Sequence, residues 1–282
     1  MIKRVRGYLT WRPASDAPAE SAELEATGCT IIREVFTADE VEALKEDITH
    51  IFDTLPADGR TRGRRPPEED DMFRYEMFNR SALCQQAIAH PRILEVIEPL
   101  LGEDCHVIAN TAWRNPPKPN DPAQAWHVDA GPHVPLPDGV TWPASIPHPV
   151  FAIGTHIFLM DCGEGDGPTG VIPGSHLSGR FPPTGELMNP ALSYNGQGAR
   201  KLLCNAGDVG LFVSDVWHRR LPTGPADRGR FFLQVHYGRR DIAQRIRTTE
   251  EVNQVSAEAM RRATEPRMKQ LIGLHSPYFY DG

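Results

Sequence analysis

The stretch Gln-Ala-Trp-His-Val-Asp at positions 124–129 decides how this 282-residue chain is interpreted. Side chains two residues apart on a β-strand leave the same face, so His127 and Asp129 project together. Two histidines and one carboxylate form a facial ligand set that holds Fe(II) and leaves one side of the octahedron open. His218 supplies the second histidine, and Arg230 follows it by twelve residues. The sequence therefore predicts an iron site at His127, Asp129 and His218, with Arg230 as a fixed cation for an acid bound there.

The His-x-Asp spacing is weak evidence when it stands alone. With 11 histidines in the chain, about 0.6 such matches are expected by chance from average composition. The alternative for His127 is a partly buried histidine bonded to a nearby acid. The surrounding segments are more specific, because apolar stretches typical of strands cover 151–160, 206–213 and 231–237, and a glycine-rich polar turn covers 161–167.

These segments, in this order, resemble the phytanoyl-CoA dioxygenase family of iron- and 2-oxoglutarate-dependent oxygenases. The resemblance covers roughly residues 20 to 240, and the Val-Ile-Pro-Gly-Ser-His run ending at His176 is its most specific part. It implies Fe(II), 2-oxoglutarate as cosubstrate and O2, with release of succinate and CO2. It also implies a double-stranded β-helix. The matching elements are Trp126–Asp129, Gly167–His176, Gly207-Asp208 before His218, and Arg230 to Tyr237.

The resemblance also suggests which arginine binds the far carboxylate of 2-oxoglutarate. Arg228 and Arg230 both lie within range of His218. Arg230 keeps the family's seven-residue offset to the aromatic residue that ends the strand, here Tyr237, so it is the predicted cosubstrate ligand. The chain departs from the family at Arg220, where many members carry serine or threonine, and the carboxylate is therefore expected to be bound somewhat differently.

Three further polar residues match family positions that contact the cosubstrate, and each has a plain alternative as a polar residue of the core or of a turn. They are Gln124, Thr169 and His156. Three others are interpreted as structural: His176, Arg219 and His236.

Composition limits the possible partners and the compartment. A net charge of −7 and a pI of about 5.9 argue against a nucleic-acid surface, which normally needs a basic patch. Five scattered cysteines without a Cys-x-x-Cys spacing predict a reducing compartment. No signal peptide is evident, and no apolar run approaches the ~20 residues of a membrane span. The expected protein is soluble and cytoplasmic, acts on a small molecule, and contacts neither nucleic acid nor membrane.

The chain is expected to form one domain over 1–282, mainly β, as a jelly roll with flanking helices. The expected parts are a helical region at about 17–105, a jelly-roll core at about 106–240 and a C-terminal helix at about 248–263. Within the first part, the expected elements are helices at 17–26, 37–52, 81–89 and 91–101, and a strand at 30–36.

The long loop that follows Asp129 holds six prolines between 130 and 149. Loops of this length are usually functional or disordered, so we expect it to form one wall of the substrate pocket through Trp142 and His133. The alternative is a rigid surface strap. Arg74 and Arg180 could bind an acidic group of the substrate, or be ordinary exposed arginines.

Two alternatives to hydroxylation of a small organic metabolite stay open at this point. The same site could catalyse desaturation, epoxidation or cyclisation in a biosynthetic pathway. A different class would be a catalytically inactive jelly-roll protein that binds a metal such as zinc. Conversion of 2-oxoglutarate to succinate with iron(II) would distinguish the enzyme from the inactive protein.

Overall fold

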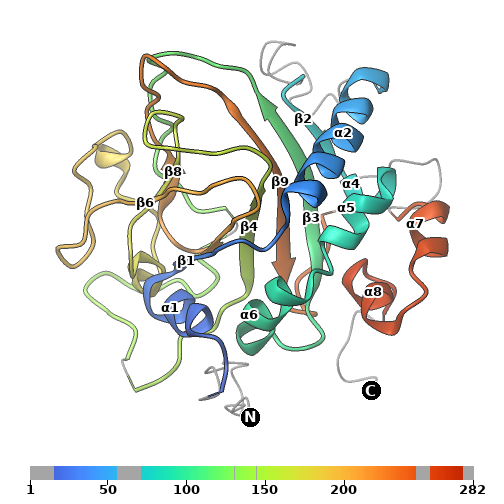
Figure 1. The fold of residues 1–282 in the computed structure, drawn as a ribbon. Coiled ribbons are helices and arrows are strands. Elements are labelled where there is room, and N and C mark those ends of the chain that lie inside the picture. The colour runs from blue at the N-terminus through green and yellow to red at the C-terminus, as the bar shows by residue number, and fades with distance from the viewer. Residues whose placement is uncertain (1–15, 56–70, 130, 144, 246–254, 276–282) are drawn as a thin grey trace.

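The computed structural model describes residues 16–55, 71–129, 131–143, 145–245 and 255–275. Within these residues two antiparallel sheets face each other as a jelly roll, with helices on the outer side of the larger sheet (Figure 1). The predicted fold class, a mainly β double-stranded β-helix with flanking helices, is confirmed.

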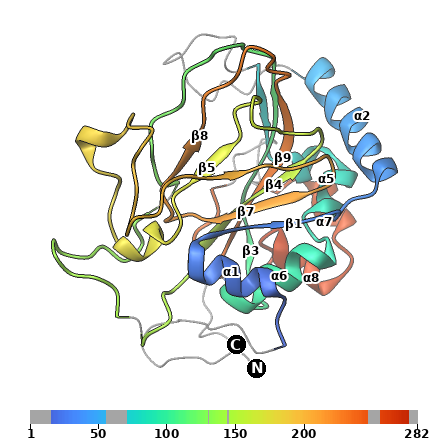
Figure 2. The same ribbon diagram turned by 60° about the vertical axis from the view of Figure 1, so that its left-hand side comes forward.

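The larger sheet has six strands in the order β1-β7-β4-β9-β3-β2, and the smaller has three in the order β6-β5-β8. The larger sheet consists of β1 (Cys29–Ile32), β2 (Phe73–Tyr75), β3 (His106–Asn115), β4 (Ala152–Phe158), β7 (Val209–Val213) and β9 (Arg230–Gly238). The smaller consists of β5 (Thr169–Val171), β6 (Arg200–Leu202) and β8 (His218–Arg220). Figure 2 shows the smaller sheet on the side away from the helices.

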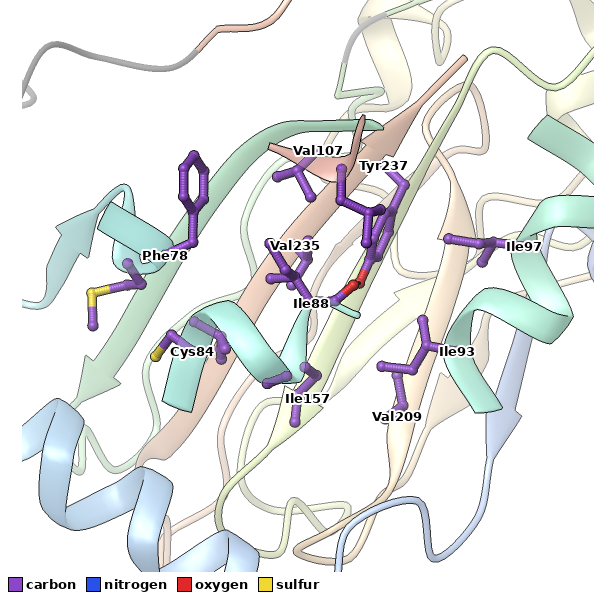
Figure 3. Packing of buried hydrophobic residues seen from close by; sticks show 14 of the residues in the cluster. Phe78, Cys84, Ile88, Ile93, Ile97, Val107, Ile157, Val209, Val235 and Tyr237 are labelled. Carbon is purple, nitrogen blue, oxygen red and sulfur yellow. The ribbon is translucent and has the colours of Figure 1, made fainter. Parts of the chain in front are cut away.

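Strand β9 illustrates how the sequence separates the two faces of the larger sheet. Because side chains alternate along a strand, its odd-numbered residues from Phe231 to Tyr237 all enter the core under the helices. Figure 3 shows Val235 and Tyr237 among residues of these helices, including Ile88 and Ile93. The Tyr237 hydroxyl donates a hydrogen bond of 2.8 Å to the Ile88 carbonyl. The even-numbered residues are thereby left for the space between the sheets.

The helices cover the larger sheet, as their apolar faces require. Helix α2 begins at the predicted capping box, in which the side chains of Thr37 and Glu40 accept each other's backbone N–H groups. Helix α6 has the bounds expected from the sequence and ends at Gly102, whose φ is +100°. The helices on this side are α1 (Ala19–Thr27), α2 (Ala38–Thr54), α4 (Met77–Arg80), α5 (Ala82–Ala87) and α6 (Pro91–Leu101). Two short 3-10 helices, η1 (Ser175–Ser178) and η2 (Thr184–Glu186), lie in the connections after β5.

Three expectations about elements need correction. The strand predicted to reach residue 36 ends at Ile32, because Glu34 takes a positive φ of 52° and the chain turns. The segment 73–75 forms an unexpected edge strand, β2, paired with β3. Of the C-terminal helix predicted at 248–263, residues 248–254 lie outside the described residues. The described part contains α7 at Ala257–Arg262, and a further helix, α8, spans Pro266–Leu271. No helix in the described part of the chain is long and apolar enough to cross a membrane.

Candidate functional site

The backbone brings His127 and His218 together from segments 91 residues apart. Their main chains form an isolated antiparallel bridge, in which each N–H donates to the other's carbonyl at 3.0 Å. Asp129 is fixed in the same way, since its N–H donates to the Ser214 carbonyl at 3.1 Å. His218 begins strand β8, whereas His127 belongs to no regular strand. The two rings lie with centroids 4.4 Å apart.

The side chains of the three predicted ligands converge on one point. Oδ1 of Asp129 lies 3.4 Å from Nε2 of His218 and 3.8 Å from Nε2 of His127. One ligand atom from each of the three residues lies within 4.8 Å of the others, and no other group of this kind occurs among the described residues. Metal–ligand bonds of 2.0–2.2 Å place neighbouring ligand atoms of an octahedron about 3 Å apart. The observed spacing therefore requires only a small inward movement of the side chains.

Backbone carbonyls orient both imidazoles in the same manner. Nδ1 of His127 lies 2.9 Å from the Ala125 carbonyl, and Nδ1 of His218 lies 2.9 Å from the Val216 carbonyl. A carbonyl can only accept, so each Nδ1 must carry the proton and donate it. In the neutral form of each ring, Nε2 is then the nitrogen without a proton, and its lone pair is free for a metal.

The charges of neighbouring side chains shift the pKa values of the three predicted ligands. Burial by itself would raise the pKa of Asp129, but the charge and hydrogen bonds of His218 and His236 hold that pKa well below its usual range. Burial would lower the pKa of His218, but Asp129 outweighs it and the pKa is raised. The pKa of His127 is lowered by burial and then by the neighbouring charge of His218. A divalent cation would favour the anionic carboxylate and the neutral imidazoles, as its binding requires.

His236 lies in this site, although it was predicted to be structural. Its Nε2 lies 2.9 Å from Oδ2 of Asp129, the oxygen that is not turned toward the other two histidines. It shares the inner face of β9 with Arg230, six residues earlier, as the two-residue period of a strand requires. That even-numbered offset was the available signal, but it could not show which side chain His236 would meet.

Arg230 is a half-buried cation with no acidic partner among the described residues. Its Nη1 donates to the Gly167 carbonyl at 3.1 Å, and its guanidinium lies 5.4 Å from the centre of the Phe232 ring. Burial lowers its pKa to about 10. None of the described carboxylates forms an ion pair with it. The contrast with Arg228 is clear, since that side chain is 53% exposed and pairs with Asp166 at 2.6 Å.

His156 lies on the inner face of β4, close to this arginine. Its ring centroid is 4.5 Å from that of Phe232, the aromatic residue that also lies under Arg230. Burial, and next the charge of Arg230, lower its pKa to about 3. A neutral imidazole is therefore present beside the unpaired cation. Its predicted contact with the cosubstrate stays a prediction.

Thr169 and Gln124 are placed differently from each other. Thr169 is buried on β5 and pairs directly with Arg220 on β8. The side chain of Gln124 is exposed, and its backbone N–H donates to the Arg220 carbonyl at 3.0 Å. Arg220, the departure from the family pattern, forms an ion pair with Asp121. Its charge is thus largely neutralised within the chain.

The loop after Asp129 is fastened at its start by a carboxylate. Asp215 accepts the backbone N–H of His133 at 3.0 Å and also pairs with Nδ1 of its ring. The ring stacks on Phe151, with centroids 4.8 Å apart and planes within 10°. Asp215 directly follows Ser214, the residue that holds the backbone of Asp129. The predicted wall residue His133 therefore lies near the metal site, in a fixed orientation.

Further along, the same loop is tied to the segment after η1. The guanidinium of Arg180 donates to the carbonyls of Pro137 and Val140. This contact argues against the predicted role of Arg180 in binding an acidic group. Trp142 is half-buried, and its indole N–H donates to the Ile146 carbonyl at 2.7 Å. The position of His133 thus fits the predicted pocket wall, whereas the hydrogen bonds of Arg180 and Trp142 within the loop fit the alternative surface strap.

Arg74 requires a correction. It is only 3% exposed, and its guanidinium donates to the carbonyls of Phe52 and Leu55 at 3.2 and 3.1 Å. These carbonyls belong to the last turn of α2 and the residue after it, on the outer side of the larger sheet. A guanidinium committed there cannot bind an acidic group of a substrate at the metal side, contrary to the expectation from the sequence.

A family model described as phytanoyl-CoA dioxygenase matches residues 24–227 of this chain. The chain belongs to the phytanoyl-CoA dioxygenase family. The match covers His127, Asp129 and His218 and ends three residues before Arg230. The predicted family and enzyme class, an iron(II)- and 2-oxoglutarate-dependent dioxygenase, are confirmed.

Solved structures of similar fold agree with this assignment. The apo form of EctD from S. alaskensis matches with a TM-score of 0.62 and 22% identity, over 85% of this chain and 84% of that one. HygX from Streptomyces hygroscopicus with nickel and 2-oxoglutarate bound matches with a TM-score of 0.56 and 16% identity, over 80% and 87%. The carbocyclase SnoK from nogalamycin biosynthesis matches with a TM-score of 0.57 and 18% identity, over 82% and 87%.

Proposed function

We propose that this dioxygenase hydroxylates a small, partly apolar organic molecule. The observation that carries the proposal is the pairing of two features. Three ligand atoms converge with both Nε2 lone pairs free, and Arg230 lies nearby as a half-buried cation with no acidic partner among the described residues. The first feature fits Fe(II), which accepts imidazole and carboxylate. The second fits a dicarboxylic cosubstrate such as 2-oxoglutarate.

His127, Asp129 and His218 are the proposed metal ligands. When bound, the iron supplies the activation of O2, in which 2-oxoglutarate, O2 and a C–H bond give succinate, CO2 and a C–OH group. The protein positions these reactants. The backbone bridge between the two histidines fixes their separation, and the two carbonyls that hold Nδ1 aim Nε2 at the metal. Three protein ligands leave three positions of an octahedron for the reactants.

Arg230 is the proposed ligand for the far carboxylate of 2-oxoglutarate. A guanidinium pairs with a carboxylate through two parallel hydrogen bonds, which fixes the orientation of the acid as well as its position. Burial already lowers the pKa of this arginine, so an incoming carboxylate supplies the acidic partner that the described residues do not. Thr169 and His156 are proposed as neighbouring contacts, and Gln124 as a contact from the exposed side.

The loop 131–149 is the proposed wall of the substrate pocket. Its anchor at His133 keeps the start of the loop beside the metal site, and Trp142 offers apolar surface further along. A pocket wall excludes water and holds one C–H bond close to the metal. The support for this role is the position of the anchor, together with the half-buried tryptophan.

A reducing compartment, such as the cytoplasm, is the proposed place of action. All five cysteines are free and buried, which suits an environment that keeps thiols reduced. The proposed partner is a small-molecule substrate.

A turnover experiment tests the proposal. The purified enzyme is supplied with Fe(II), ascorbate, 2-oxoglutarate and a panel of metabolites, and succinate is measured beside the organic product. We expect succinate above the level given by the Asp129→Ala variant, and more of it with a true substrate. Heavy dioxygen should place one labelled oxygen in the product. Loss of two hydrogens without oxygen gain would indicate desaturation or cyclisation, and absence of succinate would support the inactive metal-binding protein.

A further inference from the structure

We propose that His236 is a positioning residue that holds Asp129 as a ligand through one oxygen only. The inference rests on the proposed function through a single point, the role of Asp129 as metal ligand. It assigns a role to His236, which lies toward the opposite end of β9 from Arg230, the proposed ligand of the cosubstrate.

The two oxygens of Asp129 have separate surroundings. Oδ1 faces Nε2 of His218 and Nε2 of His127, at 3.4 and 3.8 Å. Oδ2 is turned the other way and lies 2.9 Å from Nε2 of His236. A carboxylate that binds a metal is ionised and has no proton to donate, so Asp129 is the acceptor. The Nε2 of His236 must then carry the proton and donate it.

Asp129 needs such support, because His236 is its one partner among the described side chains that is not a proposed metal ligand. Asp129 belongs to no regular strand, and its N–H is held by the Ser214 carbonyl at 3.1 Å. A carboxylate can bind a metal through one oxygen or through both. Binding through both would occupy one of the three positions that the cosubstrate and O2 need. A hydrogen bond on Oδ2 favours the one-oxygen arrangement and keeps the open face free.

The fold provides room for this imidazole. His236 on β9 stands directly opposite Gly154 on β4. A Cβ atom at Gly154 would lie 3.0 Å from Nε2 of His236 and 2.7 Å from the ring of Phe212. A glycine at this place therefore lets the ring approach the carboxylate. The imidazole itself is only 7% exposed, so it is not a surface histidine that reaches Asp129 by chance.

The test measures metal affinity instead of turnover, with Co(II) as the probe, by titration of the metal-free enzyme. In His236→Gln the amide nitrogen reaches about as far as Nε2, so the donor is kept. In His236→Asn the amide is too short to reach Oδ2, and in His236→Leu the donor is lost. Loss of a group that supports a metal ligand typically costs about 10–100-fold in metal affinity. We expect that loss for the asparagine and leucine variants, and less than about a threefold change for the glutamine variant.

Gln234 offers a matched control on the same face of the same strand. Its side-chain oxygen accepts a hydrogen bond of 2.9 Å from the Trp113 indole, which is not part of the contact with Asp129. Gln234→Leu removes a partly buried hydrogen bond of the same length and should leave Co(II) affinity unchanged. Excess metal should restore succinate production in His236→Asn, because the defect lies in holding the metal. If His236→Leu does not fold, the difference in Co(II) affinity between His236→Asn and His236→Gln is sufficient to test the inference.

The outcomes separate the inference from the proposed function. Equal losses in the glutamine and asparagine variants would show that the imidazole only fills space, and unchanged affinity in both would show no role; either result overturns the inference. Asp129→Ala is measured beside them. If that variant also binds Co(II) as tightly as the natural chain, the proposed metal site itself is wrong. If Asp129→Ala loses the metal while His236→Asn keeps it, only the inference fails.

Discussion

Replacing Arg230 with alanine should weaken 2-oxoglutarate binding far more than replacing its neighbour Arg228. Arg230 is half-buried, burial lowers its pKa to about 10, and none of the described carboxylates pairs with it. A bound carboxylate would therefore be its first acidic partner. Removing one member of a buried ion pair costs about 3–5 kcal/mol, which corresponds to a loss of about 150-fold to 5,000-fold in affinity.

Arg228 supplies the matched control for this prediction. It lies two residues away, is 53% exposed and already pairs with Asp166, so Arg228→Ala should change cosubstrate affinity by less than about threefold. The assay is calorimetric titration of 2-oxoglutarate into each variant, loaded with Co(II) so that no turnover occurs. Metal affinity is measured first and should be the same in both. Equal effects of the two substitutions, or a larger effect of Arg228→Ala, would refute the assignment of Arg230.

Further predictions concern the loop, the outer arginine and the response to acid. Deleting the loop tip, residues 138–142, should abolish coupled product formation and leave slow succinate production intact; coupling that survives the deletion would show that the loop is not a pocket wall. Arg74→Met should lower the denaturant midpoint of unfolding but leave 2-oxoglutarate affinity unchanged, since its guanidinium binds helix carbonyls. Burial lowers the pKa of His176 to about 4, below the value of about 6.5 expected on unfolding. The unfolded chain therefore binds more protons as the pH falls from 6.5 toward 4, and stability is lost in that window by about 1.4 kcal/mol per pH unit. His176→Gln should lose about 2 kcal/mol less between pH 6.5 and pH 5, and equal losses in denaturant titrations would contradict this explanation.

The sequence predicted the structure correctly where residues close together in the chain determine the local conformation. A spacing of two residues was enough to place His127 and Asp129 together, and the capping box at Thr37 marked the start of α2. The His90-Pro91 pair and Gly102 gave both ends of α6, because proline favours a first turn and glycine accepts a positive φ.

The sequence was uninformative wherever the outcome depended on contacts between distant segments. The alternation along β9 assigns His236 to the inner face, but only the folded structure shows that Asp129 meets it there. Arg74 gave no sign in sequence that its guanidinium would bind the end of α2. The early turn at Glu34 is a left-handed backbone conformation at a residue type that rarely adopts it. Such features depend on tertiary contacts that no local pattern records.

The most direct test of the account is a crystal structure of the protein with Fe(II) and 2-oxoglutarate, grown without oxygen, with the metal located by its anomalous signal. We predict one iron bound by Nε2 of His127, Oδ1 of Asp129 and Nε2 of His218 at about 2.0–2.2 Å. The far carboxylate of 2-oxoglutarate should lie on the guanidinium of Arg230. An iron bound at other residues, or a cosubstrate whose far carboxylate lies away from Arg230, would contradict it.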